Sequence, residues 1–206
     1  MREVISETAR VSQFATLADS VQVWHLAEVR ERAKLGSRVI VGSGSYIGVG
    51  VEIGDDSKVQ NHALIYDPAS LGKGVFIGPG AILTNDRYPR AVNERMQQKS
   101  ALDWKPVGVT VLDGASIGAG VICVAPVTIG SWSMVAAGAV VLRDVADYAL
   151  VVGNPARQIG WVGRSGSRLI RNREHEGRWR CEITGESYEE VEAGGIRLMN
   201  EPVASG

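Results

Sequence analysis

The chain has 206 residues, 45% of them hydrophobic, which is enough for one domain core with a short appended tail. Its 22 Lys and Arg residues nearly balance 23 Asp and Glu residues, so it lacks the basic excess of proteins that bind nucleic acids or anionic membranes. Two cysteines without C-x-x-C spacing argue against a disulfide framework, and no apolar run is long enough to span a membrane. Because the N-terminus also lacks a signal-peptide pattern, we expect a cytoplasmic protein without a membrane partner.

A six-residue repeat organises most of the chain. Each hexad begins with a branched aliphatic residue, or once with Cys123, and all but the interrupted hexad at Leu83 have a small or β-branched residue four positions later. The hexads begin at Ile5, Val11, Leu17, Val23, Val29, Leu35, Val41, Ile47, Ile53, Val59, Ile65, Leu71, Ile77 and Leu83, and then at Val111, Ile117, Cys123, Ile129, Val135 and Val141. Neither a strand nor an α-helix has a period of six with two inward positions. The pattern therefore predicts an all-β fold, a β-helix of short flat strands separated by turns.

The repeat is interrupted once and ends before the C-terminus. Between Leu83 and Val111 the chain holds about 22 residues more than a regular hexad, which predicts an inserted loop at about 85–110. Its density of Asn, Asp and Arg favours a functional loop. We expect the β-helix to occupy residues 1–146 and an exit segment and tail to occupy 147–206. A short helix or hairpin in that tail would cap the end of the β-helix, which otherwise exposes sheet edges.

Apolar residues also occupy outward positions. Tyr46, Leu64 and Ile82 are spaced so that they stack in one column, and Ile122 and Val140 form a second. Outward apolar columns on a β-helix need a partner surface.

The hexads I-G-V-G-V-E, I-G-D-D-S-K and I-G-A-G-V-I resemble those of the hexapeptide-repeat acyltransferases. This resemblance implies a left-handed parallel β-helix with three hexads per coil. It also implies self-association as a homotrimer with active sites between subunits, in agreement with the outward columns.

Three longer segments resemble one group within that family, the nucleotide-linked amino-sugar N-acetyltransferases. They are V-Q-N-H-A-L-I-Y-D, G-V-F-I-G-P-G-A-I-L-T-N-D-R-Y-P-R and Y-A-L-V-V-G-N-P-A-R-Q-I-G-W. The resemblance implies transfer of an acetyl group from acetyl-CoA to the 3-amino group of a UDP- or dTDP-linked hexose, by direct attack of the amine on the thioester and without a metal. One departure, C-V-A-P-V-T-I-G, puts Pro126 near the expected cofactor groove.

Asn61, Asn85 and His62 are the candidate catalytic residues. Asn61 and Asn85 share the same position in the hexad and fall on adjacent faces at nearly one level. An amide offers both a donor and an acceptor, so it can polarise the thioester carbonyl or orient the amine. His62 suits a general base near neutral pH, or a substrate contact. An amine that titrates near about 8 needs less help than a hydroxyl, because the departing thiolate can accept its proton.

The remaining candidates bind substrate or cofactor. The nucleotide sugar would meet residues of the loop and one aromatic residue before it, since arginine forks bind phosphate bidentately: Asp86, Arg87, Tyr88, Arg90 and Tyr66. Acetyl-CoA would meet small turn residues that leave backbone groups open, and two arginines suited to its 3′-phosphate: Gly118, Ala119, Ala136, Ala137, Arg143 and Arg157.

Alternatives stay open at this point. A sugar or serine O-acetyltransferase would use His62 as a true base, and a non-catalytic scaffold would bind no acetyl-CoA. A γ-type carbonic anhydrase needs three histidines on zinc, but His25 and His62 have no third partner in the repeats. The sequence leaves the sugar, the nucleotide and the pathway undetermined.

Overall fold

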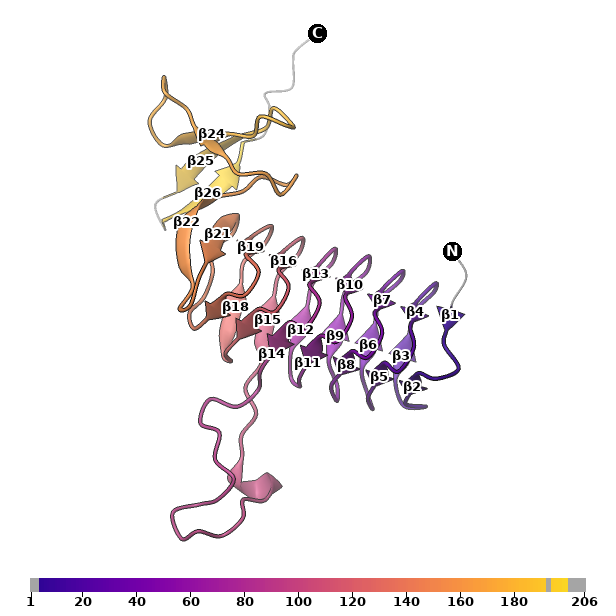
Figure 1. Ribbon diagram of the computed structural model, residues 1–206. Coiled ribbons are helices and arrows are strands. Elements are labelled where there is room, and N and C mark those ends of the chain that lie inside the picture. The colour runs from indigo at the N-terminus through magenta and orange to yellow at the C-terminus, as the bar shows by residue number, and fades with distance from the viewer. Residues whose placement is uncertain (1–3, 192–193, 200–206) are drawn as a thin grey trace.

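The computed structural model describes residues 4–191 and 194–199, and most of them form a parallel β-helix (Figure 1). Strands of two or three residues alternate with turns, so that every third strand pairs with the next in one of three sheets. Partners within a sheet are 18 residues apart, as in the pairs Val4–Gln22 and Leu64–Ile82. The β-helix predicted from the repeat is confirmed, and so are the three hexads per coil that the family resemblance implies.

The three sheets form the three faces of the β-helix. The first face contains β1 (Val4–Ile5), β4 (Gln22–Val23), β7 (Ile40–Val41), β10 (Lys58–Val59), β13 (Phe76–Ile77), β16 (Ser116–Ile117), β19 (Met134–Val135), β21 (Ala149–Val152) and β22 (Arg157–Trp161). The second face contains β2 (Arg10–Val11), β5 (Glu28–Val29), β8 (Tyr46–Ile47), β11 (Leu64–Ile65), β14 (Ile82–Leu83), β17 (Ile122–Cys123) and β20 (Val140–Val141). The third face contains β3 (Thr16–Leu17), β6 (Lys34–Leu35), β9 (Glu52–Ile53), β12 (Ser70–Leu71), β15 (Val109–Val111) and β18 (Val127–Ile129).

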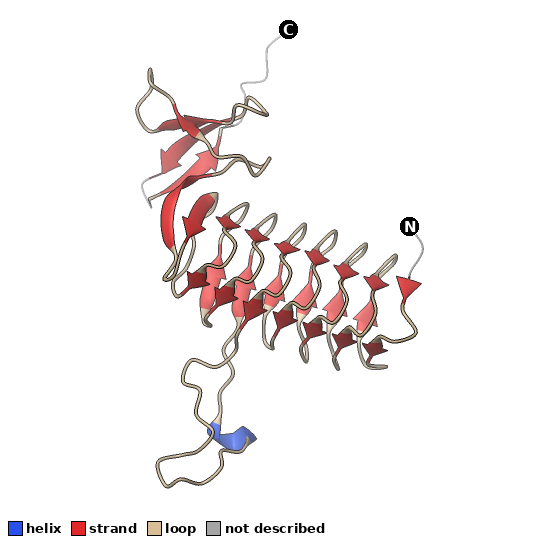
Figure 2. Cartoon of the chain, in the orientation of Figure 1, coloured by secondary structure: helices blue, strands red, loops and turns tan. Residues whose placement is uncertain are grey.

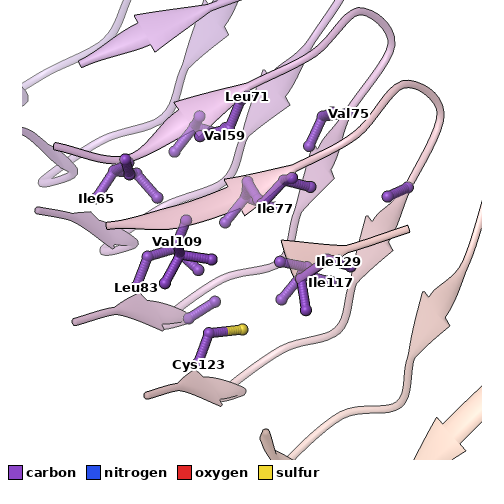
Figure 3. Close-up of a cluster of buried hydrophobic side chains, with 14 of the residues drawn as sticks. Val59, Ile65, Leu71, Val75, Ile77, Leu83, Val109, Ile117, Cys123 and Ile129 are labelled. Atoms are coloured by element: carbon purple, nitrogen blue, oxygen red, sulfur yellow. The ribbon is translucent and has the colours of Figure 1, made fainter. Parts of the chain in front are cut away.

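Both inward positions of the hexad fill the core. Aliphatic residues such as Ile65 and Leu83 are fully buried, and so are the small residues four positions later, such as Ala63 and Ala81. Figure 3 shows aliphatic side chains from all three faces meeting on the axis, together with Cys123. Ile5 is still 44% exposed, because it lies in the first described coil and no coil packs below it.

The turns lie at three corners, which we name by the faces that they join. The first corner joins the first face to the second, as at residues 60–62; the second corner joins the second face to the third, as at 66–68; the third corner leads back to the first face. From Ser20 to Gly138 a residue with positive φ recurs every sixth position of the coils except at Pro68 and Pro126, either a glycine such as Gly44 (φ 66°) or a residue such as His62 (φ 59°). Such backbone suits glycine best, which explains the glycine content.

The inserted loop forms an arm that leaves the β-helix at the second corner (Figure 1). It begins after β14 and returns at β15, which starts at Val109, two residues before the expected end of the loop. Its one helical turn is η1 (Ala101–Asp103), the blue segment of Figure 2. The arm does not disturb the stacking, because Ser70 pairs with Thr110 as regularly as it pairs with Glu52.

This undisturbed stacking corrects one expectation. Ile82 pairs with Ile122, and Ile122 with Val140. The two apolar columns predicted from the sequence are therefore one column on the second face, which Tyr46 and Leu64 extend towards the N-terminus.

The predicted cap is a hairpin. β21 pairs parallel with β19, and β22 folds back antiparallel on β21, so this hairpin covers the last edge of the first face. A separate four-stranded antiparallel sheet follows, which we call the tail sheet: β23 (Ile170–Arg171), β24 (Arg178–Arg180), β25 (Ser187–Val191) and β26 (Gly195–Leu198). The rings of Tyr148 and Tyr188 meet edge to face at 5.2 Å and join the tail sheet to the hairpin. No helix within the described ranges is long and apolar enough to cross a membrane.

Candidate functional site

The residues predicted from the sequence fall on two corners and at the C-terminal end of the β-helix. Asn61 and His62 lie at the first corner, whereas Tyr66, Asn85 and the arm lie at the second. The second face separates these two groups.

Small residues line the first corner above Asn61. Gly80 donates its backbone N–H to the carbonyl of Asn61, and the turns at Gly118–Ala119 and Ala136–Ala137 stack above it. A Cβ atom at Gly118 would lie 2.5 Å from the backbone nitrogen of Ala137, so no larger residue fits there. The four predicted cofactor residues Gly118, Ala119, Ala136 and Ala137 thus form one strip of accessible backbone. It ends three coils from Asn61, about 14 Å along the axis.

Asn61 has a structural task at this corner. Its side-chain oxygen accepts a hydrogen bond of 2.9 Å from the backbone N–H of Ser43, one coil below. Carboxylates at the same hexad position make the same bond: Asp55 to Ser37, Asp113 to Lys73 and Asp147 to Ser131. The amide NH₂ of Asn61 remains available for a substrate, because the bond uses only the oxygen.

His62 is exposed and lies over a glycine of the coil below. A Cβ atom at Gly44 would lie 2.5 Å from Nδ1 of His62, so the imidazole occupies space that only glycine leaves free. Among the described residues, no hydrogen bond holds the imidazole. It can therefore accept a proton or a substrate hydrogen bond without first breaking another contact.

At the second corner, Tyr66 stands directly below the root of the arm. Its ring packs against the ring of Tyr46 with centroids 5.3 Å apart, and Arg30 donates a 3.3 Å hydrogen bond to the Tyr46 hydroxyl. Asn85 follows β14, and its backbone carbonyl accepts from the N–H of Val107, which closes the base of the arm. These contacts hold Tyr66 and Asn85 in place where the arm leaves the β-helix.

The arm contains a cavity of its own, of about 670 Å³. Asp86 and Arg90 line it, together with Lys99 and Trp104, whose buried indole N–H has no hydrogen-bond partner in the described structure. The other two predicted arm residues lie outside its lining, where the guanidinium of Arg87 sits 5.5 Å above the ring of Tyr88. The predicted substrate residues of the arm are therefore split between a cavity and an exposed cation–aromatic pair.

Asn61 and Asn85 cannot contact one small group within a single chain. Because Leu64 pairs with Ile82, the two asparagines are at adjacent levels but six residues apart along the strand direction, at most about 20 Å. A site that uses both residues must join the first corner of one copy to the second corner of another.

Arg143 and Arg157 meet at the C-terminal end of the β-helix. Both line a cavity of about 150 Å³ beside Ala156 and Gln158. Both side chains are exposed, and Arg157 donates only to the neighbouring carbonyl of Ala156. Two accessible guanidinium groups at one cavity suit the binding of a phosphate.

Sequence reasoning missed Asp67 and the chemistry of Cys181. Asp67 occupies the same hexad position as Asn61 and Asn85, a signal that was available in the spacing. Cys181 is buried in the tail sheet, and burial by itself raises the pKa of a thiol. Hydrogen bonds from Ser165, Ser167 and Thr184 outweigh burial and lower the pKa of Cys181 to about 6.

Cys123 behaves as the core residue that the repeat predicts. It is fully buried on the axis, and burial raises the pKa of its thiol to about 12. Within the described ranges, no three His, Cys, Asp or Glu side chains gather closely enough to hold a metal ion.

Comparison of the chain with known proteins shows which protein family has this repeat. The family model described as the hexapeptide repeat of succinyl-transferase matches residues 32–66. Over these residues the chain carries this hexapeptide repeat. A hexapeptide-repeat acetyltransferase from Vibrio cholerae, solved with acetyl coenzyme A, superposes with a TM-score of 0.53 at 28% identity, over 64% of this chain and 72% of that one.

Two curated relatives of this hexapeptide-repeat protein differ in their acceptors. A dTDP-3-amino-3,6-dideoxy-α-D-galactopyranose 3-N-acetyltransferase from Aneurinibacillus thermoaerophilus is 54% identical over 59 residues, 29% of this chain and 31% of that protein. Serine acetyltransferase 4 from Arabidopsis thaliana is 32% identical over 135 residues, 66% of this chain and 30% of that enzyme. The chain therefore matches somewhat less than a third of the length of each relative.

Proposed function

We propose that this hexapeptide-repeat protein is an acetyl-CoA-dependent N-acetyltransferase that acts on the 3-amino group of a UDP- or dTDP-linked hexose. The observation that carries the proposal is the strip of accessible backbone at the first corner. It gives a long, thin acyl carrier a path from Arg157 to Asn61 and His62, with phosphate-binding groups at one end and polar groups at the other. The amino-sugar acetyltransferase relative supports an amine as the acceptor.

The reaction is a direct transfer. The amine nitrogen forms a bond to the thioester carbonyl carbon, the carbon–sulfur bond breaks, and the departing thiolate takes up the amine proton. Asn85 orients the amine and donates a hydrogen bond where charge develops on the thioester oxygen. Phosphates of the nucleotide meet Arg87 and Arg90 of the arm.

The proposed assembly is a homotrimer with its active sites between subunits. The apolar column on the second face is the contact surface. A cyclic trimer uses heterologous contacts, in which one edge of a surface meets the opposite edge of its neighbour. Since the first and second corners are the two edges of the second face, a ring built on it brings Asn61 of one copy near Asn85 of the next.

A second function is favoured by one observation, the unpartnered imidazole of His62. A hydroxyl acceptor needs a base, and His62 is free to act as one in a sugar or serine O-acetyltransferase. The serine acetyltransferase relative belongs to this class.

Thiol release from acetyl-CoA tests both functions. The wild-type protein is assayed against UDP- and dTDP-linked 3-amino hexoses, their 3-hydroxy counterparts, and serine. Turnover with a nucleotide-linked amino sugar alone supports the N-acetyltransferase. Turnover confined to hydroxyl acceptors contradicts it, and the absence of thermal stabilisation by acetyl-CoA points to a non-catalytic scaffold.

A further inference from the structure

Two polar side chains at the second corner depart from the bonding pattern of the β-helix. At the hexad position two residues after the inward aliphatic, Asp55, Asn61, Asp113 and Asp147 each accept a hydrogen bond from the backbone N–H one coil below. Asp67 and Asn85 share this position. Neither side chain forms that bond, or any other hydrogen bond to a described residue, and both are half-buried.

These two side chains are neighbours. Ile65 pairs with Leu83, so Asp67 and Asn85 stand two residues beyond paired positions on adjacent coils, about 4.8 Å apart along the axis. Asp67 lies over the turn at Gly48, where an added Cβ atom would come within 3.2 Å of its carboxylate oxygen. The arm begins immediately after Asn85. A carboxylate and an amide therefore stand side by side, with free hydrogen-bonding capacity, at the mouth of the arm.

We infer that Asp67, together with Asn85, binds the amino group of the acyl acceptor and so selects an amine over a hydroxyl. This inference rests on the proposed function. An amine that titrates near about 8 reaches the protein mostly as an ammonium ion, which releases one proton to solvent water before its nitrogen attacks the thioester. A carboxylate gains a charge-assisted hydrogen bond from that ion which a hydroxyl cannot offer. Asn85 adds a carbonyl acceptor for the same nitrogen.

Among the described residues, no basic side chain forms an ion pair with Asp67. Arg30, a basic residue of this corner, is engaged with Glu28, Glu31 and the hydroxyl of Tyr46. Tyr66, beside Asp67, presents its ring to Tyr46. The Asp67 carboxylate is thus free of a side-chain ion pair within the described structure, and the Tyr46–Tyr66 ring pair lies beside it.

The test compares Asp67→Asn, which keeps the shape but removes the charge, with wild type. The acceptors are a dTDP-linked 3-amino-3,6-dideoxyhexose, its 3-hydroxy counterpart, and the matching UDP-linked pair. We expect Asp67→Asn to raise KM for the amino acceptor about 10- to 100-fold and to leave KM for acetyl-CoA unchanged. Asp55→Asn is the matched control, because it neutralises a carboxylate at the same hexad position on the third corner.

Direct binding by calorimetry separates this inference from the proposed function. Wild type should bind the amino sugar more tightly than the hydroxy sugar by a similar factor, and Asp67→Asn should bind both equally. This binding result would support the role of Asp67 even if no acetyl group were transferred. A lack of acetyl transfer would refute the proposed function alone. Acetyl transfer with an unchanged KM in Asp67→Asn leaves the function intact and overturns the inference. Wild type that fails to discriminate between the two sugars also overturns the inference, without reference to any variant.

Discussion

At the scale of single residues, one hexad position performs two tasks. The side chain two residues after the inward aliphatic usually accepts a backbone hydrogen bond from the coil below, as Asn61 does from Ser43. Asn85 and Asp67 do not. Residues with the same sequence signature thus divide into those that hold turns together and those whose polar groups are free for a ligand.

Asn85 should matter more to catalysis than His62. Loss of one hydrogen-bond donor to a developing oxyanion typically costs about 100- to 1000-fold in kcat, so Asn85→Ala should show a loss of this size. His62→Asn should retain most activity with an amino acceptor, because an amide replaces one hydrogen bond. Both variants are measured at saturating acetyl-CoA. A nearly inactive His62→Asn beside an active Asn85→Ala would favour the O-acetyltransferase instead.

Gly44 should control the position of the His62 ring. Gly44 and Gly50 both have positive φ, 66° and 69°, so alanine at either costs about 1–2 kcal/mol of stability. Only at Gly44 does the new methyl group collide with the imidazole, since nothing lies within 4 Å of a Cβ at Gly50. The NMR shift of the His62 Cε1 proton should therefore change in Gly44→Ala and not in Gly50→Ala. Equal shifts in both variants would contradict this account.

At the scale of elements, the β-helix supplies fixed positions and its additions supply chemistry. The stacked turns of the first corner present accessible backbone. The arm lines the cavity that includes Arg90, and the β21–β22 hairpin contributes Arg157 to the cavity at the end of the β-helix. This division follows from the repeat itself, because inward positions are committed to the core and functional variation is confined to corners and insertions.

Arg157 should recognise the 3′-phosphate of acetyl-CoA. It borders the end cavity with Arg143, and its guanidinium is exposed. Arg157→Ala should raise KM for acetyl-CoA about tenfold or more, since a charge-assisted hydrogen bond is lost. The KM for the 3′-dephospho thioester should change much less. An equal change for both thioesters would refute this assignment.

The tail sheet should gain stability as pH rises from about 6 to about 8.5. The pKa of Cys181 is lowered to about 6 in the folded chain, while an unfolded thiol titrates near about 8.5. Its stabilising contribution is therefore fully present above about 8.5 and is lost as pH falls through about 6. In urea unfolding, the difference in free energy between wild type and Cys181→Ser should widen over this range. A difference independent of pH would show that the thiolate contributes nothing.

At the scale of the whole molecule, the three faces have different outer surfaces. The third face presents polar residues, including the Lys34–Glu52 ion pair, Ser70 and Thr110. The second face presents a single apolar column of five residues: Tyr46, Leu64, Ile82, Ile122 and Val140. An apolar column of this length on one face alone is the feature that the proposed trimer explains.

Ile82→Glu should disrupt the proposed trimer. The new carboxylate would stand in the middle of the apolar column, and its burial without a partner charge is costly. Ser70→Glu, on the polar third face, is the matched control and should leave assembly unchanged. Light scattering after size-exclusion chromatography gives the mass of each. A wild-type monomer, or a trimer that tolerates Ile82→Glu, would contradict this interface.

The sequence by itself determined the fold, because the hexads repeat the same pattern of two inward-facing positions. A large residue at one position and a small one four later can both be buried in a β-helix of short strands, whereas neither a regular strand nor an α-helix has this period. The coil of three strands was implied by the resemblance to the hexapeptide-repeat acyltransferases. The sequence also located the arm, the exit and most candidate site residues.

Only the tertiary structure decided how these residues are used. Whether the side chain of Asn61, Asp67 or Asn85 accepts a backbone hydrogen bond depends on its geometry relative to the coil below. The two apolar columns predicted from the sequence form one column because the chain returns from the arm without a shift in strand register. The thiolate environment of Cys181 arises from Ser165, Ser167 and Thr184 converging across the tail. In each case the deciding contact joins residues far apart in the chain, and periodicity carries no information about such contacts.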